Sequence, residues 1–178
     1  AVSKLAECRR GLILISGTPG SGKSEWLDAL LVNLAERDRW LFAVYSPENF
    51  PTVGHLVKLV EKRIRKPFSA GPTPRMTEQE YADGAAWVLD HFLWLDTDLK
   101  SPEALIAQAT AYGSGVRLGV VLDPWNTLEH QRGGLSETDY VSLVLTDVTR
   151  MARTTKAHIW LVAHPAKLPR NKDGTRPI

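Results

Sequence analysis

An eight-residue segment, Gly-Thr-Pro-Gly-Ser-Gly-Lys-Ser at positions 17–24, constrains the fold of this 178-residue chain more than any other feature. It matches the pattern G-x-x-x-x-G-K-[ST], follows an apolar run at Gly11–Ser16 and precedes a run with helical spacing. Glycines let backbone N–H groups turn inward, and the start of a helix adds positive potential, so such a loop suits phosphate. We therefore expect a nucleoside triphosphate site formed by Gly17, Thr18, Pro19, Gly20, Ser21, Gly22, Lys23 and Ser24.

The loop also predicts individual roles. Lys23 is expected to reach the β- and γ-phosphates, and the Ser24 hydroxyl to bind Mg²⁺. Because Pro19 has no N–H group, the backbone donors should come from Gly20 to Ser24. The alternative is a glycine-rich turn that matches by chance, and the strand before it and the helix after it argue against that alternative.

Short apolar runs alternate with longer amphipathic runs along the chain, a pattern typical of an α/β domain. The expected strands are 11–16, 40–45, 92–95, 118–122 and 158–163. The expected helices are 23–37, 53–65, 77–91, 101 to about 113, and 136 to about 155. Ser101 and Ser136 are expected N-caps, and Asp139 resembles the acid of a capping box. We expect a P-loop NTPase with a doubly wound, mostly parallel sheet flanked by helices, and with its ligand at the carboxyl ends of the strands.

Three other strand ends carry polar side chains. Asp123 directly follows an apolar strand, where a carboxylate can hold Mg²⁺ opposite Ser24, although Asp is also common in turns. Glu48 follows the second strand and could activate the attacking water, or be a solvated loop residue. His164 ends the fifth strand and could bind the γ-phosphate, or make only a local hydrogen bond. Together with the loop, they supply a candidate for each group that a hydrolytic NTPase needs.

Positive charge is concentrated near the end of the chain. The formal net charge is +2, but residues 165–178 contain four cations and one acid, so the rest sums to −1. The four cations could follow a nucleic-acid backbone without reading its sequence, or be an ordinary solvated loop. The candidate DNA contacts are Lys167, Arg170, Lys172 and Arg176, with Arg132 as a weaker candidate.

Other features exclude several classes of protein. Cys8 is the single cysteine, so an internal disulfide is excluded, and no Cys/His cluster suggests zinc. The longest apolar runs are too short to span a bilayer, and we find no secretory leader. We therefore expect a protein of the cytosol or an organelle matrix with no membrane contact.

Four segments together resemble one family: GTPGSGKS, SPEN with Glu48, VVLDPWN with Asp123, and WLVAHPAK with His164. They are similar to the RecA-like motor domain of DnaB-type replicative helicases. The resemblance is greatest to the phage primase-helicases and the mitochondrial helicase Twinkle, which carry a His in the last motif. It covers roughly residues 10–178.

The resemblance implies a hexameric ring that encircles single-stranded DNA and moves 5′ to 3′ by hydrolysing Mg-ATP. Primase or other replisome components are possible partners, and a bacterial or phage-encoded cytoplasmic protein, or a mitochondrial matrix protein, is the implied setting. Lys23 and Ser24 are implied to bind phosphate and Mg²⁺, Glu48 to act as the catalytic base, Asp123 to bind the metal and His164 to sense the γ-phosphate. Two implied DNA-binding loops span about 126–135, with Arg132, and 165–178, with the basic tail.

The same family's motor domain continues with further strands and an arginine finger that completes the neighbouring subunit's ATP site. We therefore expect residues 1–178 to form a RecA-like ATPase domain, with residues 1–10 as a linker and the C-terminal part of the domain lying beyond residue 178. An arginine finger contributes about 10³–10⁵ in rate, so rapid hydrolysis is not expected from these residues alone.

Two other functions remain open at this stage. A small-molecule P-loop kinase can share the loop pattern, although Glu48 is placed for water rather than for an acceptor hydroxyl. A nucleotide-dependent assembly or loading module that binds DNA without fast hydrolysis is also compatible with the lack of an arginine finger in this sequence.

Overall fold

The computed structural model describes residues 11–18, 20–113, 116–129 and 132–164. Its strands form one five-stranded sheet with the order β1-β5-β4-β2-β3, and every neighbouring pair is parallel. The strands are β1 (Gly11–Ser16), β2 (Leu41–Tyr45), β3 (Phe92–Trp94), β4 (Leu118–Leu122) and β5 (His158–Ala163). The expected parallel sheet is confirmed, and the strand ends differ from the expected ones by at most one residue.

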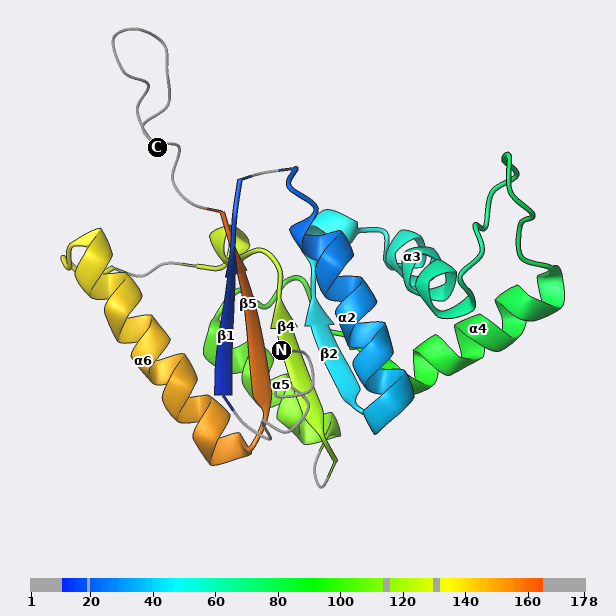
Figure 1. Cartoon of the computed structure of the whole chain (residues 1–178). Helices are drawn as coiled ribbons and strands as arrows, with labels where there is room; N and C mark the ends of the chain where they lie inside the picture. Colours follow the sequence, from blue (N-terminus) through cyan, green and yellow to red (C-terminus); the bar gives the residue numbers. More distant parts are fainter. Residues whose placement is uncertain (1–10, 19, 114–115, 130–131, 165–178) are drawn as a thin grey trace, which may run out of the picture.

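Helices cover both faces of the sheet (Figure 1). They are α2 (Lys23–Asp38), α3 (Thr52–Ile64), α4 (Glu78–His91), α5 (Pro102–Tyr112) and α6 (Glu137–Thr155). Two 3₁₀ turns, η1 (Pro47–Asn49) and η2 (Trp125–Thr127), follow β2 and β4. Helices α2, α3 and α4 lie on one face, and α5 and α6 lie on the other, which is the doubly wound arrangement that the sequence predicts.

Each face of the sheet has its own apolar core, because successive strand residues point to opposite sides. The first core joins strand residues such as Phe42 and Val121 to buried residues of α2, α3 and α4. The second joins Val120 and Ile159 to buried residues of α5 and α6. Every residue of β4 is buried, which explains why this strand reads as a continuous apolar run rather than as an alternating one.

Side-chain caps determine where three helices begin. The hydroxyls of Ser101 and Ser136 accept the N–H groups of Ala104 and Asp139, as the sequence predicts. The expected capping box at Asp139 is wrong in detail, because its short carboxylate accepts the Ser136 hydroxyl at 2.6 Å instead of a backbone N–H. A complete capping box is present at Thr77 and Glu80, where it begins α4.

Trp26 shares the helical spacing of the apolar residues in α2, which predicts that it packs in the core, and this prediction is wrong. Its side chain is 53% exposed, whereas Leu27 and Leu31 of the same helix are 1% exposed. Apolar residues occupy more than one side of α2, so their spacing alone does not indicate which of them faces the sheet.

The close approach of Phe42 to Gly119 in the middle of the sheet gives a test of the packing. A Cβ added at Gly119 would lie 2.4 Å from the Phe42 ring, so Gly119→Ala should lower the free energy of unfolding by about 1–3 kcal/mol. Gly54→Ala is the matched control, because Gly54 is an exposed residue of α3 with open space around its Cα. The control should raise the same free energy by about 0.5–1 kcal/mol. Urea unfolding monitored by tryptophan fluorescence measures both, and equal stability of the two variants would contradict this packing.

Candidate nucleotide-binding site

The register of the parallel ladder places the predicted site residues at one end of the sheet. Ser16 pairs with Ala163, so Gly17 and His164, which follow them, leave β1 and β5 at the same level. Tyr45 pairs with Leu122, so Ser46 and Asp123 leave β2 and β4 together. The Asp123 N–H donates to the Tyr45 carbonyl at 2.9 Å and extends this pairing by one residue. The phosphate loop joins β1 to α2 at this end of the sheet (Figure 1).

The loop has the backbone that its sequence predicts. Gly20 and Gly22 have φ values of +75° and +80°, in the left-handed region that favours glycine. Gly17 is favoured for a different reason, the close approach of Ser21. A Cβ at position 17 would lie 3.2 Å from the Ser21 hydroxyl oxygen. Pro19 lies outside the described residues.

Lys23 is the first residue of α2 and turns back over the loop. Its ammonium group donates to the carbonyls of Gly17 at 2.8 Å and Thr18 at 2.9 Å. The Ser21 N–H, one of the expected phosphate donors, instead donates to the Thr18 carbonyl at 3.2 Å. These bonds give the loop a definite shape and place the Lys23 cation beside the positive end of α2.

Asp123 and Ser24 are in contact, as their proposed roles require. Asp123 is 6% exposed, and this burial is the main cause that raises its pKa above the ordinary value. A hydrogen bond from the Ser24 side chain acts in the opposite direction. The negative charges of Asp28 and Glu48 raise the pKa of Asp123 further, and His164 lowers it, so all three lie within its electrostatic reach.

Glu48 lies in η1 with its side chain exposed. The turn that carries it is held by Asn49, whose amide donates to the Ser46 hydroxyl at 2.9 Å. Lys58 of α3 donates to the side-chain oxygen of Asn49 at 3.1 Å. Sequence reasoning did not identify Asn49 or Lys58, since the link between them depends on how α3 packs beside η1.

The side chain of Asn126, which the sequence analysis did not identify, binds the backbone of His164. Its backbone N–H donates to the Asn126 side-chain oxygen at 3.2 Å, which connects η2 to the end of β5. Its Nδ1 is buried and has no hydrogen-bond partner among the described residues. A free ring nitrogen near Asp123 suits a polar ligand group at this end of the sheet.

Arg132 is the one candidate DNA-binding residue that lies among the described residues. Arg132 is exposed and pairs with Glu137 at 3.8 Å, at the start of α6. The other four candidates lie outside the described residues: Lys167, Arg170, Lys172 and Arg176.

The donors fit a magnesium nucleotide better than a metal held by protein alone. Ser24 and Asp123 offer oxygen ligands, which Mg²⁺ prefers, and Mg²⁺ commonly completes its shell with phosphate and water. Within the described ranges, no group of three or more His, Cys, Asp or Glu side chains could hold a metal ion. A nucleotide that brings its own phosphate oxygens is therefore the ligand that this geometry fits.

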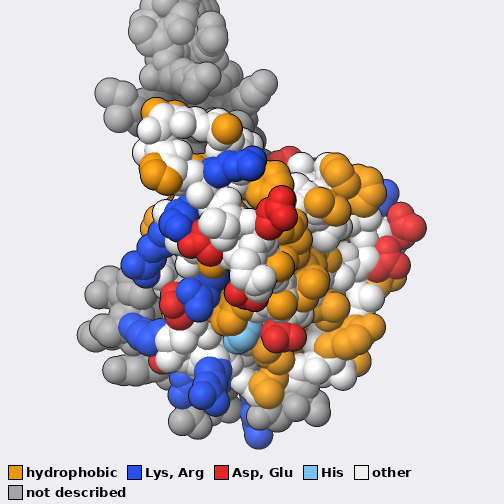
Figure 2. Space-filling model, turned by 90° about the vertical axis from the view of Figure 1, so that its right-hand side faces the viewer, with side chains coloured by type: hydrophobic (Ala, Val, Ile, Leu, Met, Phe, Trp, Pro, Cys, Tyr) orange, Lys and Arg blue, Asp and Glu red, His pale blue; other side chains and the backbone are white. Residues whose placement is uncertain are grey.

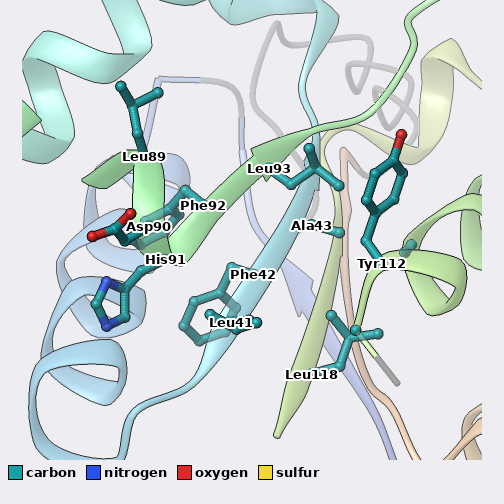
Figure 3. A pocket seen from close by; sticks show the side chains of 12 residues that line it. Leu41, Phe42, Ala43, Leu89, Asp90, His91, Phe92, Leu93, Tyr112 and Leu118 are labelled. Carbon is teal, nitrogen blue, oxygen red and sulfur yellow. The ribbon is translucent and has the colours of Figure 1, made fainter. Parts of the chain in front are cut away.

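An apolar cavity of about 100 Å³ lies at the opposite end of the sheet (Figure 3). It is lined by residues at the amino ends of β2, β3 and β4, and by Tyr112 at the end of α5. None of the predicted site residues lines it. On the α4 side of the molecule, the surface shows a band of hydrophobic side chains, with Lys and Arg gathered along one margin (Figure 2). Among the described helices, none has the length and apolar character needed to cross a bilayer.

Comparison with curated proteins identifies one relative of clear similarity. The Twinkle homolog protein, chloroplastic/mitochondrial, of Arabidopsis thaliana is 39% identical over 176 residues, which cover 93% of this chain. The chain spans about a quarter of that relative, 24% of its length. No family model matches the chain.

Two solved structures share the fold. One is an ATPase domain, with a TM-score of 0.69 and 18% identity over 99% of this chain and 66% of its own. The other is a DnaB-like replicative helicase described with its interactions with primase, with a TM-score of 0.69 and 17% identity over 99% of this chain and 46% of its own. The sequence match relates this chain to one part of the Twinkle homolog, and the shared fold is the RecA-like fold of DnaB-type helicase ATPase domains.

Proposed function

We propose that this domain binds Mg-ATP and couples its hydrolysis to translocation on single-stranded DNA and to duplex unwinding. The observation that carries the proposal is the contact of Ser24 with the buried Asp123, next to a glycine-rich loop and within electrostatic reach of Glu48 and His164. A binding module without chemistry would need the loop and the metal ligands. It would not need a carboxylate and an imidazole at the other two strand ends.

In this proposal, each side chain has one task. Lys23 exchanges its loop carbonyls for the β- and γ-phosphates, and Ser24 and Asp123 hold the Mg²⁺ ion. When bound there, Mg²⁺ would supply positive charge that neutralises the phosphates. Glu48 accepts a proton from the attacking water at a carboxylate oxygen, which its exposed position allows. His164 donates a hydrogen bond to a γ-phosphate oxygen through Nδ1, which has no partner among the described residues.

The proposal extends to the assembly. We propose that residues 1–178 belong to one RecA-like ATPase domain, with residues 1–10 as a linker. We also propose that copies of the protein form a ring and that this ring is a hexamer. The related helicase is described with primase, which supports primase as a possible partner. We propose two possible locations: the cytoplasm, for a bacterial or phage-encoded protein, and the matrix of an organelle. The name of the Arabidopsis relative, chloroplastic/mitochondrial, supports the second.

Substitution of the proposed base tests the chemistry. Glu48→Gln in the full-length protein should lower the kcat of DNA-stimulated ATP hydrolysis by about 10²–10⁴, because the amide cannot take a proton. The Kd for ATP should stay within twofold, since the proposal assigns phosphate and metal binding to Lys23, Ser24 and Asp123 and not to Glu48. Phosphate release with and without single-stranded DNA measures the first quantity, and fluorescent-nucleotide titration the second.

Glu78→Gln is the matched control, because Glu78 is an exposed carboxylate at the start of α4 and should leave both quantities unchanged. Full hydrolysis by Glu48→Gln would contradict the assigned base. Turnover only with a small acceptor molecule would indicate a kinase, and binding of ATP without turnover by the wild type would indicate an assembly module.

Asp123 gives a test that depends on pH. Burial raises its pKa in the folded chain above the usual 3.8, so the folded chain holds this proton more tightly than the unfolded chain does. Stability from this group is therefore lost as pH rises from about 3.8 through the raised folded pKa. Asp123→Asn removes that loss, and each pKa unit corresponds to about 1.4 kcal/mol. At pH 7 the variant should melt at a higher temperature, by roughly 2–4 °C per kcal/mol.

The same variant should lose stabilisation by Mg-ADP, because a neutral amide is a poor Mg²⁺ ligand. Thermal unfolding between pH 4 and pH 8, with and without Mg-ADP, measures both effects. A lower melting temperature together with intact Mg-ADP stabilisation would contradict the assignment of Asp123 to the metal.

DNA binding should depend on salt if the basic residues near the end of the chain contact phosphates. Four contacts from Lys167, Arg170, Lys172 and Arg176 predict a slope of log K against log salt of about −2.8, from about −0.7 per contact on a single strand. Each Lys or Arg to Gln substitution should make the slope less steep by about 0.7. Fluorescence anisotropy with a labelled oligonucleotide measures it, and an affinity independent of salt would exclude these contacts.

A further inference from the structure

A chain of three hydrogen-bonded side chains, two of them buried, has no part in the chemistry proposed above. His55 of α3 is 2% exposed, and its Nε2 lies 3.1 Å from the Asp28 carboxylate of α2, which is also buried. The Trp94 indole N–H of β3 donates to Nδ1 of His55 at 3.1 Å. His55 therefore connects three elements of the fold through two hydrogen bonds.

The indole partner determines which ring nitrogen of His55 carries the proton. An indole N–H only donates, so Nδ1 must be an unprotonated acceptor. The proton of the neutral ring is then on Nε2, which donates to Asp28. A fixed tautomer between a donor and an acceptor makes both bonds directional, and burial strengthens them.

Each end of this chain leads to a residue of the proposed site. Asp28 lies one helical turn after Ser24 on α2, and its charge acts on Asp123. Trp94 pairs in register with Val44 of β2, the strand that leads into the η1 turn and Glu48.

Helix α3 also contacts η1 and α2 through its lysines. Lys58 donates to Asn49 at 3.1 Å and lies 3.4 Å from Glu25, and Lys62 lies 2.6 Å from Glu25. Glu25 is 56% exposed, and ion pairs of this kind contribute little because water screens them. Beside the apolar core that α2 and α3 share, the buried contact of His55 with Asp28 is therefore the polar link between the two helices that water screens least.

We propose that His55 is a positioning residue: by fixing α3 against α2 and β3, it sets the place of the Glu48 turn relative to Lys23 and Ser24. This inference rests on the proposed function, since it concerns the alignment of the proposed base with the nucleotide. It assigns His55 no contact with substrate.

Two amide substitutions separate the two bonds. In His55→Gln the longer side chain can place its NH₂ where Nε2 lies and still donate to Asp28. In His55→Asn the side-chain oxygen can replace Nδ1 as the acceptor for Trp94, but the amide is too short to reach Asp28. His55→Asn should lower kcat for ATP hydrolysis by tenfold or more with the Kd for ATP unchanged, because a displacement near 1 Å can cost about 10²-fold. His55→Gln should keep kcat within about threefold of the wild type.

A double variant that carries both His55→Asn and Glu48→Gln distinguishes a positioning role of His55 from a general loss of structure. Adding His55→Asn to Glu48→Gln should slow the full-length protein no further than Glu48→Gln alone, because the group that it positions is already absent. A further tenfold loss in the double variant, or equal kcat values for His55→Asn and His55→Gln, would overturn the proposal. If His55→Asn does not fold by circular dichroism, Asp28→Ala takes its place, because it removes the partner of the same bond. An unchanged kcat in that variant would overturn the proposal equally.

Nitrogen-15 NMR of the histidine rings provides a readout independent of activity. The wild type should show His55 protonated at Nε2 and bare at Nδ1, and Trp94→Phe should change that pattern while the other histidines keep theirs. A proton on Nδ1 in the wild type would overturn the proposal. If Glu48→Gln hydrolyses ATP normally, the proposed function itself fails; if Glu48→Gln is inactive while His55→Asn matches the wild type, only this inference fails.

Discussion

The parallel ladder of β1, β5, β4 and β2 is the constraint on which the candidate site depends. Gly17, His164, Asp123 and Ser46 come together because four strands, separated along the chain, end within about two residues of one level. A slip of one residue in any of these strands would move its end by about 3.3 Å and turn its side chains to the opposite face. The two apolar cores prevent such a slip, since it would expose buried residues on both faces of the sheet.

The same packing imposes an electrostatic cost on the site. Asp123 must be buried to lie at the end of β4 beside Ser24, and its burial disfavours the ionised form that a metal requires. The nearby charges of Asp28 and Glu48 add to that cost. A divalent cation reverses it, so the arrangement favours a bound ion over bare carboxylates. Stability of the isolated fold and affinity for Mg-nucleotide are therefore opposed at this one residue.

Features that depend on neighbouring residues could be predicted from the sequence, and long-range contacts could not. The phosphate loop and strand ends were predictable because glycine conformation, apolar runs and N-cap residues act over a few positions. The supports of the site join distant residues: His55 and Asp28 are 27 positions apart, and His164 and Asn126 are 38 apart. No local pattern specifies such pairs, since helix packing brings them together. The position of Trp26 was also predicted wrongly. Several sides of α2 are apolar, and only the packing of the helix against the sheet determines which of them is buried.

The two hydrogen bonds from Lys23 to the carbonyls of its own loop make phosphate binding an exchange of partners rather than a simple gain. A hydrogen bond from a charged donor contributes about 1.5–3 kcal/mol. The ammonium group must break its two bonds to the loop before it can bind phosphate, so the loss of these bonds offsets part of the gain. In the proposed function, the free energy that Lys23 gains from the phosphates is therefore reduced by the loss of these two bonds. In the proposed function, its charge would contribute most where the phosphate oxygens become more negative, which is in the transition state.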